Sequence, residues 1–121
     1  FGCQITGMAY PYGTYNDEVV QILKKCKIQY ARSVVSSGAF KLQKNLLIFK
    51  PTCHHADENI WELLEKFLKE KSEEKQLFYI WGHSYEFDVN NNWKRMEEIL
   101  DRLIGHNNIF YGTNREVLLP C

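Results

Sequence analysis

The residues best suited to acid–base chemistry follow an abrupt change in the sequence, where the apolar run "LFYIW" ends in Gly82, His83 and Ser84. Glu86 and Asp88 come shortly after. An imidazole here could donate a proton to a leaving amine or alcohol, and either carboxylate could orient its ring. The alternative is a structural histidine bonded to nearby backbone, or a solvated loop residue. Residue type alone favours neither interpretation.

A second group of chemically capable residues is Cys53, His54 and His55. In an extended segment Cys53 and His55 share a face, so metal ligation is conceivable. A complete zinc site uses three or four protein ligands, and the spacing shows no third one. Exposed loop histidines are the favoured interpretation. A cysteine nucleophile, paired with His83 or His54, is weaker still, because no local signature surrounds Cys53.

The stretch Tyr10-Pro11-Tyr12-Gly13 predicts a tight turn that carries two aromatic rings. Packed aromatics in a turn are the simpler interpretation. The functional alternative is a backbone N–H at Tyr12 that points toward an oxyanion developing on a substrate.

Composition narrows the classes of partner. The 121 residues fit one domain, and fifteen Lys and Arg balance fifteen Asp and Glu. We therefore expect no nucleic-acid partner, since the basic footprint of such proteins is absent. We expect no membrane either, because no apolar stretch approaches the roughly 20 residues that span a bilayer. Four widely spaced cysteines allow three disulfide pairings, and free thiols are preferred.

The elements expected to position these residues alternate between strands and helices. Apolar and β-branched runs predict strands at Ile5–Ala9, Ile28–Val35, Leu46–Phe49, Leu77–Trp81 and Ile109–Tyr111. Helices are expected to begin at Asn16, at Asp57 and at Asn91 or Asn92, with a short element at Glu116–Leu119. Two of the strands are continuously apolar, which is typical of parallel strands buried on both faces. The fold class predicted is α/β.

Parallel α/β sheets and barrels assemble their sites at the carboxyl ends of the strands. The predicted strand ends carry Tyr10–Gly13, Arg32–Ser33, Thr52–His55, His83–Asp88 and Thr113–Asn114. We therefore expect several of these polar groups to converge.

Six stretches, in this order, resemble the C-terminal half of the polysaccharide deacetylase family, the NodB-homology carbohydrate esterases. They are "AYPYGTYNDEVVQILKK", "IQYARSV", "KPTCHHAD", "LFYIWGHSYEFD", "NNWKRMEEIL" and "IFYGTNRE". They span essentially the whole chain, and "WGHSYEFD" with "YPYG" and "YARSV" is fairly specific. The resemblance implies that residues 1–121 form one partial domain of parallel strands alternating with helices, equivalent to half of a distorted (β/α)7 barrel.

The resemblance also implies an activity, the hydrolysis of N- or O-acetyl groups on sugars by a hydrolase that acts on non-peptide carbon–nitrogen bonds. His83 matches the general acid of the family, and the Tyr12 backbone N–H matches its oxyanion donor. The family's usual arginine falls at Ala9, so Arg32 is the candidate orienting residue. Residues assigned to binding the carbohydrate substrate are Tyr10, His54, His55, Glu86 and Asp88.

The family's Asp-Asp and HxxxH motifs, which supply the base and the metal ligands, do not occur in this sequence. We therefore expect no metal ligands in this chain, a divalent metal (zinc) in a full-length protein, and little activity from the chain alone. Half a barrel exposes strand edges, which predicts self-association or pairing with the missing N-terminal half. Two alternatives remain: a non-catalytic carbohydrate-binding or interaction module, and a thiol-dependent hydrolase at Cys53.

Overall fold

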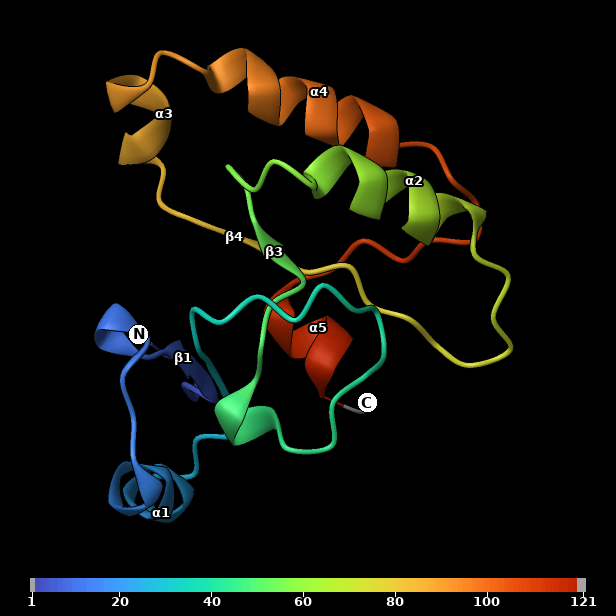
Figure 1. The fold of residues 1–121 in the computed structure, drawn as a ribbon. Helices are drawn as coiled ribbons and strands as arrows, with labels where there is room; N and C mark the ends of the chain where they lie inside the picture. Colours follow the sequence, from blue (N-terminus) through green and yellow to red (C-terminus); the bar gives the residue numbers. More distant parts are fainter. Residues whose placement is uncertain (1, 120–121) are drawn as a thin grey trace. The chain divides into compact units, whose positions relative to one another are not determined.

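Short parallel strands alternate with helices in the computed structural model, which describes residues 2–119 (Figure 1). The strands are β1 (Gly7–Ala9), β2 (Tyr30–Arg32), β3 (Cys53–His54) and β4 (Ile80–Trp81). The helices are α1 (Asp17–Lys25), α2 (Ile60–Lys69), α3 (Tyr85–Val89), α4 (Trp93–Leu103) and α5 (Asn114–Leu118), with 3-10 turns η1 (Pro11–Gly13) and η2 (Leu46–Ile48). β1 pairs with β2 and β3 with β4, both in parallel. The mixed character of the predicted fold is confirmed, but the described residues form no closed barrel.

The chain divides into two compact units. Unit 1 contains residues 1–35, 43–50 and 110–121, and unit 2 contains residues 36–42 and 51–109. Between residues 2 and 119 no helix is both long enough and apolar enough to cross a bilayer.

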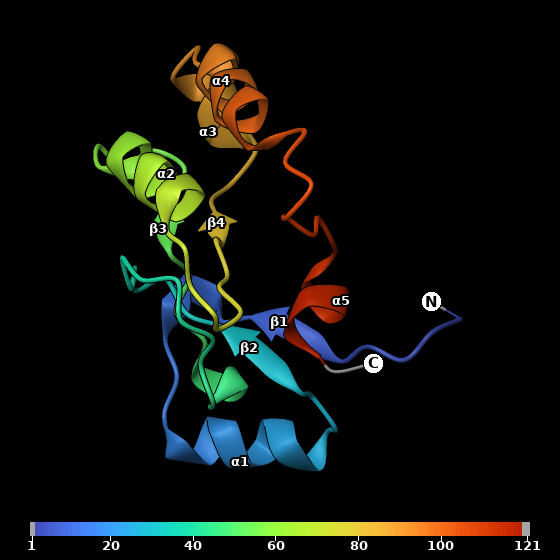
Figure 2. The ribbon, with the colours of Figure 1, turned by 90° about the vertical axis from the view of Figure 1, so that its right-hand side faces the viewer.

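Unit 1 is built on the β1–β2 pair, along which α1 lies (Figure 2). Its core contains Tyr10, Val20, Ala31 and Leu47. The side chain of Asn16 caps α1, since its Oδ1 accepts a hydrogen bond of 2.9 Å from the Val19 backbone N–H. This cap was predicted from the sequence, and it satisfies a donor that the first helical turn leaves unpaired.

Unit 2 is built on the β3–β4 pair and on α2 and α4, which lie side by side (Figures 1 and 2). Its core contains Cys53, Ile60, Leu64 and Ile99. The apolar spacing predicted Ile60, Leu63 and Leu64 on α2, and these residues pack in this core. On α4 the predicted Met96 and Leu103 also pack here, but the predicted Trp93 and Leu100 are exposed, and Ile99, which the spacing did not select, is fully buried. The N-cap of α2 is Asn59, two residues beyond the predicted cap Asp57, because the Asp57 carboxylate instead accepts from the Asn59 N–H within the preceding turn.

Two predicted strands are wrong. Leu46–Ile48 is a 3-10 turn, which the Asn45 side chain starts by accepting from the Leu47 N–H, and only Phe49 makes a parallel bridge to Arg32. A short apolar run cannot by itself distinguish a strand from a buried turn. No strand forms at Ile109–Tyr111, where the Ile109 N–H closes a turn onto the His106 carbonyl.

Candidate functional site

The parallel pairing of β3 and β4 brings two chemically capable segments together. Cys53 lies opposite Ile80 and His54 opposite Trp81, so both strands leave the sheet at the same edge. His55 follows β3 and donates its backbone N–H to the Trp81 carbonyl. His83 follows β4 after the single residue Gly82, and helix α3 begins just beyond His83. The convergence expected at the carboxyl ends of the strands therefore occurs in unit 2.

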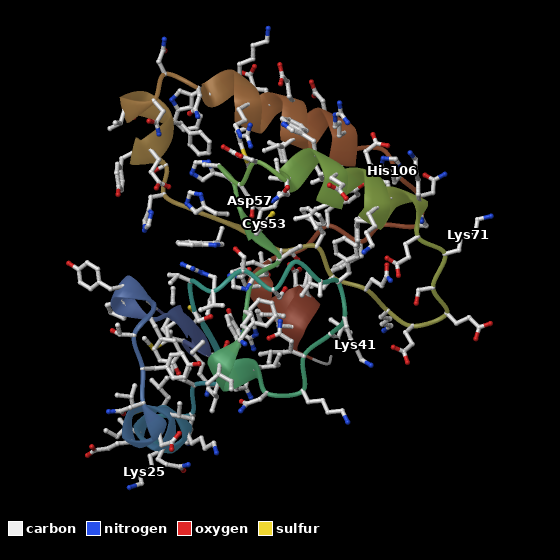
Figure 3. The ribbon with its side chains drawn as sticks, in the orientation of Figure 1. Lys25, Lys41, Cys53, Asp57, Lys71 and His106 are labelled. Atoms are coloured by element: carbon white, nitrogen blue, oxygen red, sulfur yellow. The ribbon has the colours of Figure 1, made fainter. Side chains whose placement is uncertain are left out.

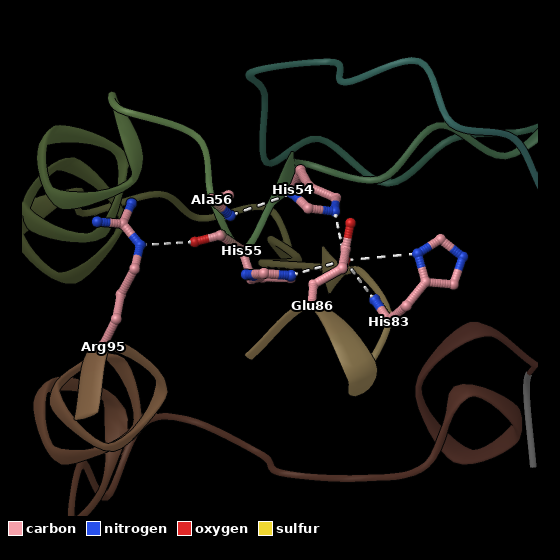
Figure 4. Close-up of polar contacts among 6 residues, drawn as sticks. All are labelled: His54, His55, Ala56, His83, Glu86 and Arg95. Atoms are coloured by element: carbon pink, nitrogen blue, oxygen red, sulfur yellow. Dashed lines mark hydrogen bonds and ion pairs between the residues drawn. The ribbon is translucent and has the colours of Figure 1, made fainter. Parts of the chain in front are cut away.

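Glu86, in the first turn of α3, lies at the centre of this edge (Figure 4). Its Oε2 lies 2.8 Å from His55 Nε2, 3.2 Å from His54 Nε2 and 3.4 Å from His83 Nδ1. The same oxygen accepts a 2.8 Å hydrogen bond from the His83 backbone N–H. One carboxylate oxygen thus joins three histidines from two strand ends.

The contacts of Glu86 favour its ionised form. The hydrogen bond from His55, followed by that from the His83 backbone, lowers the pKa of Glu86 from 4.5 to about 2. The pKa of His54 is also lowered from its ordinary value, first by desolvation and then by the neighbouring His55, although Glu86 opposes this shift. The lowered pKa of Glu86 is that of a carboxylate surrounded by donor groups.

His83 is the most exposed of the three histidines, with 53% of its side chain accessible. Its Nδ1 faces Glu86, and its other ring nitrogen, Nε2, points away from the cluster (Figure 4). The rings of Trp81 and Tyr85 lie beside it, with centroids at 6.0 and 5.4 Å. A carboxylate behind one ring nitrogen and an open second nitrogen are what an acid–base histidine requires.

Two further residues frame the cluster. Gly82 leaves room for the His55 ring, since a Cβ at this position would clash with His55 Cδ2. The close approach of the chain at Gly82 is therefore a contact with an imidazole. Arg95, on α4, donates from Nε to the His55 carbonyl at 3.0 Å and from Nη2 to the Asp57 carbonyl at 2.8 Å. Nothing in the sequence distinguishes Arg95 from the other cations of this helix.

The other carboxylate that could have oriented His83, Asp88, has a different role. Its Oδ1 accepts a 2.7 Å hydrogen bond from the indole Nε1 of Trp93 at the start of α4. The choice between the two carboxylates, open from the sequence, is therefore resolved in favour of Glu86.

The remaining candidate residues lie in unit 1. Tyr12 has φ 55°, a left-handed conformation that non-glycine residues rarely adopt, and 96% of it is exposed. Tyr10 is buried, and its hydroxyl donates to the Leu47 carbonyl at 2.6 Å, so its side chain serves the core rather than an open binding surface. Arg32 donates from Nη1 to the Ser33 carbonyl at 3.0 Å.

Cys53 does not have the environment of a nucleophile. It is fully buried in the core of unit 2 (Figure 3), and burial, followed by the charge of Asp57, raises the pKa of its thiol to about 11. A thiol that stays protonated and inaccessible is inert. Cys3, Cys26 and Cys53 are free thiols, and Cys121 lies outside the described residues.

His54, His55 and Glu86 also form a set of ligand types that zinc accepts. Each residue offers one ligand atom, a ring nitrogen or a carboxylate oxygen, and the three atoms lie within 4.8 Å of one another. The third member is separated from His55 by a whole helix and strand, so sequence spacing could not reveal it. Cys53, which the spacing placed with His55, is not in this set.

Comparison of the chain with models of protein families, with curated proteins and with solved structures finds no match.

Proposed function

We propose that this chain supplies the proton-donating part of a hydrolase site that removes N- or O-acetyl groups from sugars, with His83 as the general acid. The observation that supports the proposal best is the pair His83–Glu86, in which Nδ1 faces a carboxylate and Nε2 points away from it (Figure 4). The resemblance in the stretch "LFYIWGHSYEFD" assigns the same role to the same histidine.

The chemistry assigned to His83 is a single proton transfer. When water has added to the acetyl carbonyl, the C–N or C–O bond breaks only if the departing amine or alkoxide acquires a proton. His83 in its charged form donates that proton from Nε2, and Glu86 stabilises the charged ring through Nδ1.

In this proposal the base and the metal ligands come from the Asp-Asp and HxxxH motifs, which this chain does not contain. The chain alone is then inactive or nearly so, and a version extended toward the N-terminus through both motifs is active. No step above depends on a metal ion held by the residues described.

The test measures acetate released from N-acetylglucosamine oligomers and from O-acetylated xylan, by the chain and by its extended version, with added zinc. We expect activity only in the extended version, and replacing His83 by Ala should lower kcat there by roughly 10²–10⁴-fold. His106→Ala is the matched control, since His106 lies in unit 2 away from Glu86 and bonds the Arg102 carbonyl. An extended version without activity on either substrate, or one indifferent to His83→Ala, would contradict the proposal.

A second candidate, a non-catalytic carbohydrate-binding module, is favoured by the aromatic rings beside His83. Tyr85 is exposed and its ring lies 5.4 Å from that of His83, which offers a face on which a sugar ring can stack. Binding of the oligosaccharide to the chain alone, lost in Tyr85→Ala but unchanged in His83→Ala, combined with no hydrolysis by the extended version, would support this candidate instead.

A further inference from the structure

The residue types of the cluster are those of a zinc site, but its hydrogen bonds determine which ring nitrogens carry protons. A histidine that binds a metal through Nε2 offers a lone pair there and carries its proton on Nδ1, which then donates to a carboxylate, a carbonyl or water. The surroundings of Nδ1 in His54 and His55 therefore decide whether these rings suit a metal or a hydrogen-bond network.

In His54 the Nδ1 atom is an acceptor. The Ala56 backbone N–H donates to it at 3.1 Å (Figure 4). Nδ1 therefore has no proton, and the neutral ring carries its proton on Nε2, 3.2 Å from Glu86 Oε2. Metal ligation through Nε2 would move the proton of the neutral ring from Nε2 to Nδ1, opposite the Ala56 N–H. Two donors would then face each other.

In His55 the same tautomer follows from burial. The residue is 2% exposed, its Nε2 lies 2.8 Å from Glu86 Oε2, and an ionised carboxylate can only accept. His55 Nδ1 is buried with no hydrogen-bond partner among the described residues. Burying a nitrogen lone pair without a donor costs less free energy than burying an N–H group without an acceptor. Ligation through Nε2 would bury that unpaired N–H.

We propose that His54 and His55 are positioning residues that donate Nε2–H to Glu86 and bind no metal ion, and that they hold the carboxylate against Nδ1 of His83. Both rings point at the same oxygen, Oε2, which also receives the His83 backbone N–H. Together with the contact to Nδ1 of His83, these make four contacts to one oxygen, which leave the carboxylate little freedom to rotate. The catalytic consequence rests on the proposed function of His83, but the hydrogen bonds themselves do not.

The first test is the tautomer of each ring, read from the ¹⁵N chemical shifts of the histidines at a pH where all are neutral. We expect His54 and His55 with the proton on Nε2 and His83 with the proton on Nδ1. Gln carries an N–H donor near the place of Nε2, whereas Leu carries none. Comparing the Gln and Leu variants at His55, and likewise at His54, therefore shows the effect of the hydrogen bond that each ring donates to Glu86. The Leu variants should shift the His83 proton from Nδ1 toward Nε2, and the Gln variants should restore it.

The pair at His54 keeps the test decisive if the buried His55→Leu variant does not fold, because His54 is partly exposed. His106→Gln is the control and should leave the three tautomers unchanged. A proton on Nδ1 of His54 or His55, or a His83 tautomer that ignores both Leu variants in folded protein, would overturn the proposal.

The second test is a titration with Zn²⁺ and with Co²⁺. We expect the three histidine signals to stay in place at equimolar metal. One-to-one binding that shifts His54 and His55 together, and that Glu86→Gln abolishes, would overturn the proposal and establish a metal site. If the tautomers are as stated while the extended version releases no acetate, the proposed function fails and the positioning network stands.

Discussion

At the scale of single residues, the decisive group is the carboxylate of Glu86. It accepts the His83 backbone N–H from the residue three positions earlier, at the start of a helix, where negative charge is favoured. It also faces two imidazoles from the other strand end. Its low pKa and its central position have the same cause, which is a set of donors that converge on one oxygen.

These contacts predict how stability depends on pH. The pKa of Glu86 is lowered from 4.5 to about 2 in the folded chain, so its contribution to stability is complete above pH 4.5 and is lost as the pH falls toward 2. The pKa of His54 is also lowered, below 6.5, so the unfolded state binds its proton first and stability declines as the pH falls below 6.5. Both groups therefore lower the free energy of unfolding as the solution becomes more acidic.

The measurement is the free energy of unfolding in urea between neutral pH and pH 2, for the chain and for Glu86→Gln. We expect the variant to lose much of the decline below pH 4.5, because Gln has no proton to gain there. Glu116→Gln is the matched control, since the lowered pKa of Glu116 comes from Thr113 in unit 1, whereas the three histidines belong to unit 2. Equal acid profiles for Glu86→Gln and the unmodified chain would show that Glu86 is not held as described.

At the scale of elements, the site depends on how closely the ends of β3 and β4 approach. Gly82 permits this approach, because the His55 ring occupies the space that a side chain at Gly82 would need. The His55 N–H bonds the Trp81 carbonyl immediately beside it. The pairing of β3 with β4 therefore also positions the imidazole of His55.

Replacing Gly82 by Ala should displace His55, weaken its hydrogen bond to Glu86 and lower the free energy of unfolding by about 1–3 kcal/mol, the usual cost of overpacking. The measurement is urea unfolding together with the ¹⁵N tautomers. Gly105→Ala is the control, since Gly105 also has a positive φ, of 83°, but has nothing within 4 Å of an added Cβ. If both variants lost equal stability and kept the cluster intact, the contact between Gly82 and His55 would be unimportant.

Helices and strands were predicted correctly where residues within the element itself specify it. Asn16 was recognised as a cap because an N-cap acts within one turn of its own helix. The apolar spacing identified the buried face of α2, but on α4 it selected the exposed Leu100 and missed the buried Ile99. Leu46–Phe49 was misread as a strand, and the five-residue helix α3 was read as a loop, because such short segments depend on neighbours that are distant in sequence.

At the scale of the whole chain, the sheets are small. Each named sheet has two strands, and sheets of this size leave backbone edges that natural proteins usually cover. Tyr12, Val89, Ile104 and Phe110 are also largely exposed apolar residues. Both features are consistent with the expected pairing with further protein, such as a second copy of the chain.

We therefore expect the weight-average mass of the chain in sedimentation equilibrium to rise with concentration above that of the 14.3 kDa monomer. Salt should weaken this association little, because the net charge is zero and the contacts are apolar or between backbone groups. A mass that stays at the monomer value into the high micromolar range would contradict this expectation.

The sequence by itself determined the alternation of strands and helices, the cap at Asn16, the end of β4 before His83 and the short list of residues able to do chemistry. These are local properties, which neighbouring residues specify through spacing and hydrogen-bonding type. Only the tertiary structure decided that Glu86 rather than Asp88 faces His83, that Cys53 is buried, and that His54 and His55 join the same carboxylate. Parallel pairing of β3 and β4 brings together residues about thirty positions apart, and no local pattern records that distance.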